Sequence, residues 1–279
     1  MLIRRPRDLR EVEEHFAFGE NWASYARLIT ATQVTEATKQ LVRLIGSEAL
    51  DGSRFLDIGC GSGLHSVAAL TAGASSVCAT DIDPESVATA ELVLERFSPH
   101  GPWSARRISA FDLSPDDIGQ FDVVYSWGVL HHTGDMRQAI ARAAAMVAPG
   151  GVLCLALYAR TPLCPLWRVE KRLYSRAPGF LQRMFRSIYT QLYRLRQRAT
   201  GGDFRTFTAH YVSRRGMDFE HDVHDWLGGY PYESITPTVA HRWLDELGFS
   251  IEREFLLARS IGLFGTGCHE FVFRKRADV

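Results

Sequence analysis

Alternating glycines that follow an apolar run with an acid near its end form the first stretch of this sequence able to do chemistry. The acid is Asp57, and Gly59, Gly61 and Gly63 come at every second position after it. Glycine lacks a Cβ, so the backbone can take positive φ and a ligand can lie directly against it. A helical pattern begins at about Leu64, and its first N–H groups suit carboxylate or phosphate oxygens. The stretch therefore predicts a strand, a tight turn and a helix that bind a nucleotide-like ligand.

The spacing of the glycines and of a second acid indicates which class of ligand fits. The dinucleotide fingerprint G-x-G-x-x-G needs a small residue where this chain has Leu64, which disfavours a nicotinamide oxidoreductase. A second apolar run ends in Asp81, about 20 residues further on, at the interval at which an acid holds ribose hydroxyls. The pattern D-x-G-x-G-x-G with this second acid favours an adenosyl ligand over a dinucleotide.

Five motifs in order resemble those of the class I S-adenosylmethionine-dependent methyltransferases, within the group related to ubiquinone and menaquinone biosynthesis. They are the glycine turn, the Asp81 strand end, a third strand end, a fourth strand with its following loop, and a turn before a fifth strand. In sequence they read FLDIGCGSG, SVCATDIDP, ISAFDL, FDVVYSWGVLHH and APGGVLCL. The resemblance covers about 100 residues and implies S-adenosylmethionine as cofactor, with S-adenosylhomocysteine as product.

Cofactor contacts follow from the resemblance at matching positions. Asp57 and the glycines would hold the methionine end, Asp81 the ribose, and Phe111 with Asp112 the adenine. Asp83 is the alternative ribose ligand, because the strand end can be placed two residues later. The full set of predicted cofactor-binding residues is Asp57, Gly59, Cys60, Gly61, Gly63, Asp81, Ile82, Phe111, Asp112 and Ser126.

Proton transfer would be the remaining task, because the cofactor already carries an activated methyl group. Histidine is the natural base at neutral pH. His131 and His132 directly follow the predicted fourth strand, with His132 slightly preferred, and His210, His221 and Tyr211 are further candidates. One imidazole of such a Leu-His-His segment often only packs or caps the next helix in this family, so the base stays open.

These residues need a scaffold, and the apolar pattern predicts one. Strands separated by helices imply a parallel sheet covered on both faces, with ligands bound beyond the carboxyl ends of its strands. The resemblance implies a Rossmann-like, doubly wound α/β fold with a seven-stranded sheet, mostly parallel, whose last hairpin is antiparallel. The predicted strands lie near residues 54–58, 76–80, 104–108, 121–125, 151–157, 250–256 and 268–273.

The chain divides into three predicted parts. Residues 1–50 form an N-terminal helical cap, and residues 51–159 and 236–279 form the S-adenosylmethionine-binding domain. Residues 160–235 interrupt this domain as a helical lid inserted after the fifth strand. Because insertions at this point commonly cover the acceptor site in the family, the lid is predicted to determine the acceptor.

One helix of the insertion, near residues 178–198, is amphipathic and basic. Apolar residues recur at three- and four-residue intervals with arginines between them, although the whole chain has a formal net charge of zero. Three interpretations stay open: a docked helix with solvated arginines, a peripheral membrane or lipid contact, and contact with an anionic substrate or RNA.

The adjacent histidines and aspartates at 221–225 resemble metal ligands, but neighbouring residues seldom converge on one ion, so no metal is predicted. Contact with the substrate is the favoured interpretation of this segment, and structural hydrogen bonding is the alternative. Five cysteines without a C-x-x-C pair favour neither a disulfide framework nor a zinc ribbon. No signal peptide or run of 18 apolar residues is found, which predicts a cytoplasmic protein.

The sequence thus predicts a methyltransferase that acts on an oxygen or nitrogen of a small-molecule acceptor. A prenylated or lipid-linked acceptor at a membrane surface is the alternative. Nucleic acid is not expected, because the net charge is zero and the Asn-Pro-Pro-Tyr type motif is missing after the fourth strand. Binding of the cofactor without turnover, the identity of the acceptor and the oligomeric state stay open.

Overall fold

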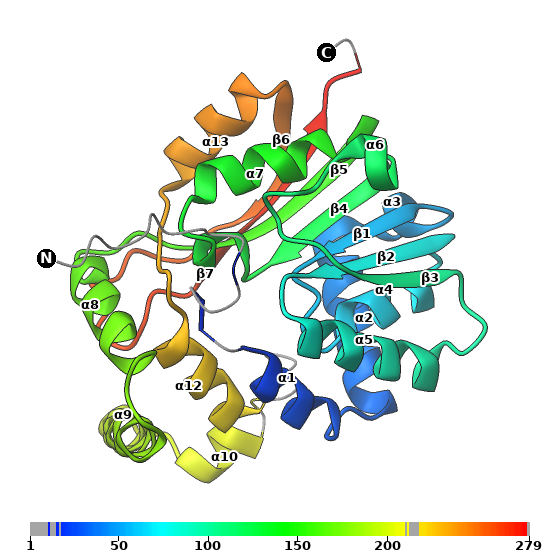
Figure 1. The fold of residues 1–279 in the computed structure, drawn as a ribbon. Coiled ribbons are helices and arrows are strands. Elements are labelled where there is room, and N and C mark those ends of the chain that lie inside the picture. The colour runs from blue at the N-terminus through cyan, green and yellow to red at the C-terminus, as the bar shows by residue number, and fades with distance from the viewer. Residues whose placement is uncertain (1–10, 12–14, 17, 210, 212–217, 278–279) are drawn as a thin grey trace, which may run out of the picture.

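A seven-stranded sheet organises the chain (Figure 1). The structure is a computed structural model that describes residues 11, 15, 16, 18–209, 211 and 218–277. The strand order is β3-β2-β1-β4-β5-β7-β6, with β7 antiparallel to both β5 and β6. The strands are β1 (Arg54–Ile58), β2 (Ser76–Asp81), β3 (Trp103–Arg107), β4 (Phe121–Trp127), β5 (Val147–Tyr158), β6 (Phe249–Phe255) and β7 (Cys268–Lys275). The predicted fold class is confirmed, including the antiparallel last hairpin.

Helices cover both faces of the sheet, as the pattern predicted. Period-two alternation sends neighbouring strand residues to opposite faces, so Phe55 belongs to one core cluster and Leu56 to the other. The first cluster includes α2 (Ala31–Ile45), α4 (Leu64–Thr71) and α5 (Pro84–Phe97), and the second includes α7 (Met136–Ala145) and α13 (Pro237–Glu246). Two short helices, α3 (Ser47–Leu50) and α6 (Pro115–Ile118), complete this part.

The segment after β5 builds a separate helical layer, which lies to the lower left in Figure 1. It contains α8 (Cys164–Tyr174), α9 (Gly179–Ala199), α10 (Phe204–Ala209) and α12 (Phe219–Gly228). A third core cluster holds it together and includes Phe16, Tyr174 and Phe219. The predicted basic helix is confirmed as α9, which has no buried residue. No described helix combines the length and the apolar character that crossing a bilayer demands.

The N-terminal helix α1 (Phe18–Ala26) bridges this layer and the sheet. Asn21 donates to the Asp225 carboxylate of α12 at 2.6 Å, and the Gly19 N–H donates to Asp83 at the start of α5 at 3.0 Å. Ser24 lies 3.2 Å from the Nε2 of His221, also on α12. These contacts place α1 across the carboxyl edge of the sheet.

Candidate active site

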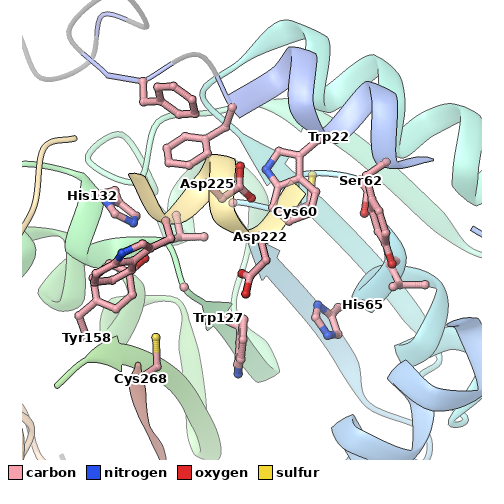
Figure 2. Close-up of a pocket in the computed structure, with 18 of the residues that line it drawn as sticks. Trp22, Cys60, Ser62, His65, Trp127, His132, Tyr158, Asp222, Asp225 and Cys268 are labelled. Carbon is pink, nitrogen blue, oxygen red and sulfur yellow. The ribbon is translucent and has the colours of Figure 1, made fainter. Parts of the chain in front are cut away.

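A cavity of about 680 Å³ lies beyond the carboxyl ends of the parallel strands. Figure 2 shows two groups of side chains around it. Trp22, Cys60 and Ser62 come from α1 and the turn after β1, whereas His132 and Tyr158 lie on the opposite side of the view. The segments after β1 and β2 and the helical layer thus contribute to a single cavity.

The glycine turn supplies backbone rather than side chains. Gly59 and Gly61 have φ of +73° and +51°, a conformation that L side chains rarely adopt. A Cβ on Gly59 would lie 2.4 Å from Val129, and one on Gly61 would lie 2.9 Å from the Trp22 ring. Gly63, with φ of 76°, precedes the first residue of α4. Gly59 lines the cavity, and Gly61 and Gly63 lie just behind its wall.

Two acids end the first two strands. Asp57 lines the cavity, and its carboxylate accepts a hydrogen bond from the Ser66 hydroxyl at 2.6 Å. Burial raises the pKa of Asp57 to about 7, with a further contribution from the charge of Asp81. Asp81 accepts from the N–H groups of Gly61 at 3.1 Å and Asp83 at 2.9 Å, and burial raises its pKa to about 6.

Some of the predicted residues at the ends of the third and fourth strands line the cavity, and others do not. Phe111 is 3% exposed and lines the cavity, as do Cys60 and Ile82. Asp112 lies outside the cavity wall, beside Ser109, whose carbonyl accepts its N–H at 2.9 Å. Ser126 is fully buried and donates its hydroxyl to the Ile58 carbonyl at 3.0 Å. Neither Asp112 nor Ser126 faces the cavity, and the roles predicted for the whole set remain predictions.

His131 and His132 point in different directions. His131 is fully buried outside the wall, and its Nδ1 accepts the Tyr158 N–H at 3.3 Å. His132 lines the cavity, and its Nδ1 lies 2.8 Å from the Pro231 carbonyl. A carbonyl can only accept, so Nδ1 carries the proton and Nε2 keeps its lone pair. Burial, with the charge of Lys171, lowers the pKa of His132 to about 3, which keeps the ring neutral.

Acidic and aromatic side chains from α12 complete the wall. Asp222 and Asp225 line the cavity, and Tyr211 donates a short hydrogen bond to Asp222. Burial, followed by the charge of Asp222, raises the pKa of Asp225 well above its usual value, although the hydrogen bond from Asn21 opposes this shift. His210 lies outside the described residues. Tyr211, another candidate base from this segment, lines the cavity as His132 does.

Lys171 of α8 lies behind this wall. Its side chain is fully buried, and its Nζ lies 3.7 Å from the centre of a Trp226 ring without a hydrogen-bond partner among the described residues. Burial lowers the pKa of the Lys171 amine and raises that of the neighbouring Glu170 carboxyl. Both shifts favour the neutral forms of the pair.

Sequence reasoning did not name Tyr158 among the site residues, and it considered Asp225 only as part of the segment 221–225. Tyr158 ends β5 and lines the cavity, with its ring 5.1 Å from that of Trp226. Its place at the carboxyl end of a central strand was a usable signal. Asp225 had only the weaker signal of its acidic, histidine-rich segment, and it lines the cavity through the packing of α12. No group of three or more potential metal ligands exists among the described histidines, cysteines and acids.

Comparisons with known proteins agree with the geometry. Residues 56–153 match a family described as "Methyltransferase domain". The ubiquinone biosynthesis O-methyltransferase of Xanthomonas campestris pv. campestris (strain B100) is 38% identical over 114 residues, which are 41% of this chain and 46% of the relative. A tRNA U34 carboxymethyltransferase of Alcanivorax borkumensis is 42% identical over 85 residues, 30% of this chain and 26% of the relative. The matched part therefore spans less than half of these relatives.

Solved structures share the fold at low identity. Magnesium protoporphyrin IX methyltransferase from Synechocystis PCC 6803, with bound SAM, has a TM-score of 0.56 at 15% identity, covering 98% of this chain and 99% of that chain. The N-methyltransferase NodS from Bradyrhizobium japonicum WM9, in complex with S-adenosyl-L-homocysteine, has a TM-score of 0.52 at 16% identity, covering 92% and 98%. These likenesses confirm the predicted fold, and the domain match over residues 56–153 agrees with the family predicted from the five motifs.

Proposed function

We propose that this chain, which belongs with the class I S-adenosylmethionine-dependent methyltransferases, transfers a methyl group to an oxygen or nitrogen of a small-molecule acceptor and releases S-adenosylhomocysteine. The observation that carries the proposal is the single cavity that connects the acids ending β1 and β2 with the polar, aromatic wall of α12. One compartment can therefore hold a nucleoside-type cofactor and an acceptor side by side.

The residues present fit S-adenosylmethionine. We assign the ribose hydroxyls to Asp81, whose carboxylate is already fixed by two backbone N–H groups. We assign the adenine face to Phe111, and the methionine end to Asp57, Cys60 and the backbone of Gly59. Gly59 lines the cavity with its backbone, and a Cβ there would lie 2.4 Å from Val129, so only glycine fits this position. Gly61, Gly63, Ile82, Asp112 and Ser126 complete the proposed set, and Gly61, Gly63, Asp112 and Ser126 would act from behind the wall.

The cofactor, when bound, supplies a methyl group activated by its sulfonium. The protein then has to hold the acceptor in line and receive a proton. We propose His132 for the second task, because it lines the cavity and its Nδ1–H is fixed on the Pro231 carbonyl, which leaves Nε2 without a proton. Tyr211 and His210 are proposed to act beside it, and His131 to position β5 through the Tyr158 N–H.

Three parts of the chain have proposed roles. Residues 1–50 form the cap, residues 51–159 and 236–279 the cofactor domain, and residues 160–235 the lid that selects the acceptor. Support comes from α9 and α12, both of which contribute side chains to the cavity wall. No disulfide joins the five cysteines, all of which the structure describes, and this agrees with the proposed cytoplasmic location.

A lipid-linked acceptor is the second candidate within the same reaction. One observation favours it: large apolar side chains of α8 and α9 stand exposed on the helical layer that also lines the cavity. The helical layer would then meet both the acceptor and the membrane surface from which it comes.

Calorimetric titration with S-adenosylhomocysteine tests the proposal. We expect micromolar binding by the native protein, and a loss of at least ~100-fold in Asp81→Ala, because hydrogen bonds to a charged group contribute about 1.5–3 kcal/mol each. Asp83→Ala tests the alternative ribose ligand, and Asp117→Ala, on the exposed helix α6, is the control. Absence of binding by the native protein would contradict the proposal.

A further inference from the structure

A stripe of exposed apolar side chains runs along α8 and α9. On α9 the stripe consists of Phe180, Met184, Ile188, Leu192 and Leu195, which are 49–63% exposed. On α8 it consists of Leu166, Val169 and Leu173, which are 56–63% exposed. Their spacings of three and four residues place each set on one helix face. Several large apolar side chains exposed along one helix face mark a contact site in a folded protein.

The loop before β7 extends the stripe. Ile261 and Leu263 are 62% and 58% exposed. The Ile261 carbonyl accepts the N–H of Leu163 at the start of α8, and the Phe264 carbonyl accepts the Tyr189 hydroxyl of α9 at 2.9 Å. The loop is thus fixed beside both helices. We call the exposed apolar residues of α8, α9 and this loop the apolar stripe.

Arginines border the apolar stripe. Residues 164–199 contain nine basic residues and one acid, Glu170, and the exposed cations include Arg172, Arg183, Arg194 and Arg198. Within the part of the chain that the structure describes, no ion pair joins these arginines to a carboxylate. A long arginine side chain can place its stem on apolar surface and its charge among anionic groups.

The positive charge of these helices distinguishes between two possible binding partners of the apolar stripe, a second copy of the chain and a lipid bilayer. A second copy docked through the same face would bring the two basic helices together, and like charges repel. An anionic bilayer offers both components at once, with acyl chains for the apolar side chains and phosphate groups for the guanidinium groups. We propose that the apolar stripe and its arginines dock this protein on an anionic lipid surface.

The face of α9 opposite the apolar stripe lines the cavity, so docking would bring the cavity close to the lipid surface. Tyr189, Tyr193 and Arg196 line the cavity, whereas Ile188 and Leu192 are exposed. Only the thickness of one helix separates the cavity wall from the docked face. An acceptor carried by the bilayer would therefore reach the cavity along the edge of α9. This last step rests on the proposed methyl transfer, but the docking does not.

Co-sedimentation with vesicles tests the docking without cofactor. The probes are vesicles of phosphatidylcholine with a quarter phosphatidylglycerol, and vesicles of phosphatidylcholine alone, each at low and high salt. We expect the native protein to sediment with the anionic vesicles at low salt, and to bind the neutral ones at least ~10-fold less, because arginines near an anionic surface attract it electrostatically. Equal binding to both vesicles, or none to the anionic ones, overturns the proposal.

The decisive variant is Ile188→Asp with Leu192→Asp, which places two acids in the middle of the stripe. Both residues are exposed, so we expect the fold and the affinity for S-adenosylhomocysteine to persist while vesicle binding falls at least ~10-fold. Leu92→Asp is the matched control, because Leu92 is 73% exposed on α5, away from the stripe. Undiminished vesicle binding by the double variant overturns the proposal. Self-association that the variant abolishes, without vesicle binding by the native protein, assigns the stripe to a second copy instead.

Discussion

The two ends of the cavity are built in different ways. The cofactor end uses backbone and short side chains from turns that directly follow β1 and β2, such as the Gly59 backbone and Asp81. The acceptor end uses side chains that converge from α1, β5, α9 and α12, such as Tyr158 and Asp225. Local sequence therefore specifies the first end, whereas tertiary packing specifies the second.

The two ends also differ in whether their buried polar groups have hydrogen-bond partners. At the cofactor end, Asp57 and Asp81 both accept hydrogen bonds within the turns. At the acceptor end, Nζ of Lys171 and Nε1 of Trp226 are buried without a hydrogen-bond partner among the described residues. A buried polar group left unpaired costs about 1–3 kcal/mol. We infer that these unpaired groups lower the stability of the folded protein at the acceptor end, as is common where a site must recognise a ligand.

The largest predicted effect tests whether backbone alone shapes the cofactor end. Gly59→Ala places a Cβ 2.4 Å from Val129 at a φ of +73°. The left-handed backbone costs about 1–2 kcal/mol, and displacement of Val129 narrows the cavity. We expect affinity for S-adenosylhomocysteine, measured by calorimetry, to fall about 100-fold.

Gly150→Ala is the matched control. Gly150 has a φ of +75°, but a Cβ there would meet nothing within 4 Å, and the residue lies outside the cavity wall. Its variant should lose some thermal stability and keep its ligand affinity. If both variants bind normally, the cofactor end does not depend on its glycine turn and the comparison fails.

An intermediate effect concerns the acids of the cofactor end. Burial raises the pKa of Asp81 to about 6, and ribose hydroxyls donate stronger hydrogen bonds to the ionised carboxylate than to the neutral acid. Ligand affinity should therefore be complete above this pKa and fall as pH drops through it, by about tenfold between pH 7 and pH 5.

Calorimetry across this pH range measures the effect. Asp57 titrates nearby, with a pKa raised to about 7, so the native profile contains both acids. Asp81→Asn should bind more weakly and show a flatter profile. A profile for Asp81→Asn as steep as that of the native protein would assign the pH dependence to Asp57 instead.

The sequence predicted the scaffold because its signals are local. Apolar runs broken by turn residues located all seven strands, with β3 and β6 starting one residue earlier and β5 four residues earlier than predicted. The longer β5 includes the turn at 148–151, since pairing with β4 begins at Val147. Strand pairing depends on neighbours distant in sequence, so single-sequence patterns locate strand ends less accurately than strand centres.

Dependence on neighbours distant in sequence also limits how well the sequence predicts the site residues. Asp57, Cys60, Asp81 and Phe111, chosen from motif position, all line the cavity. Ser126 was chosen in the same way, but its hydroxyl is used within the sheet by the Ile58 carbonyl. Motif position specifies a backbone location and not a side-chain direction.

Adjacent histidines show this limit most clearly. His131 and His132 share a single 3₁₀ turn, yet only His132 reaches the cavity. The partner of each ring lies far away in sequence, since His131 accepts the Tyr158 N–H and His132 contacts the Pro231 carbonyl. Pattern alone therefore preferred His132 only slightly, because those partners follow only from the packed structure.

The smallest predicted effect tests whether the acceptor end carries a cost in stability. Burial raises the pKa of Asp225 well above its usual value, so the folded protein holds this proton where the unfolded chain has lost it. Stability should then fall as pH rises from the unfolded pKa through the folded one. Asp225→Asn removes this dependence and can still accept the hydrogen bond from Asn21.

Thermal unfolding of Asp225→Asn measures that cost. We expect a higher Tm than that of the native protein at pH 8, a difference that shrinks towards pH 4, and unchanged affinity for S-adenosylhomocysteine. A gain of about 1 kcal/mol corresponds to about 2–4 °C for a chain of this size. The exposed Asp117→Asn serves as control and should show no gain. A lower Tm for Asp225→Asn at every pH would mean that the carboxyl group of Asp225, through its hydrogen bond from Asn21, stabilises the packing of α12 on α1. The acceptor end would then be optimised for stability like the cofactor end, and the two ends would differ only in how far apart in sequence their residues lie.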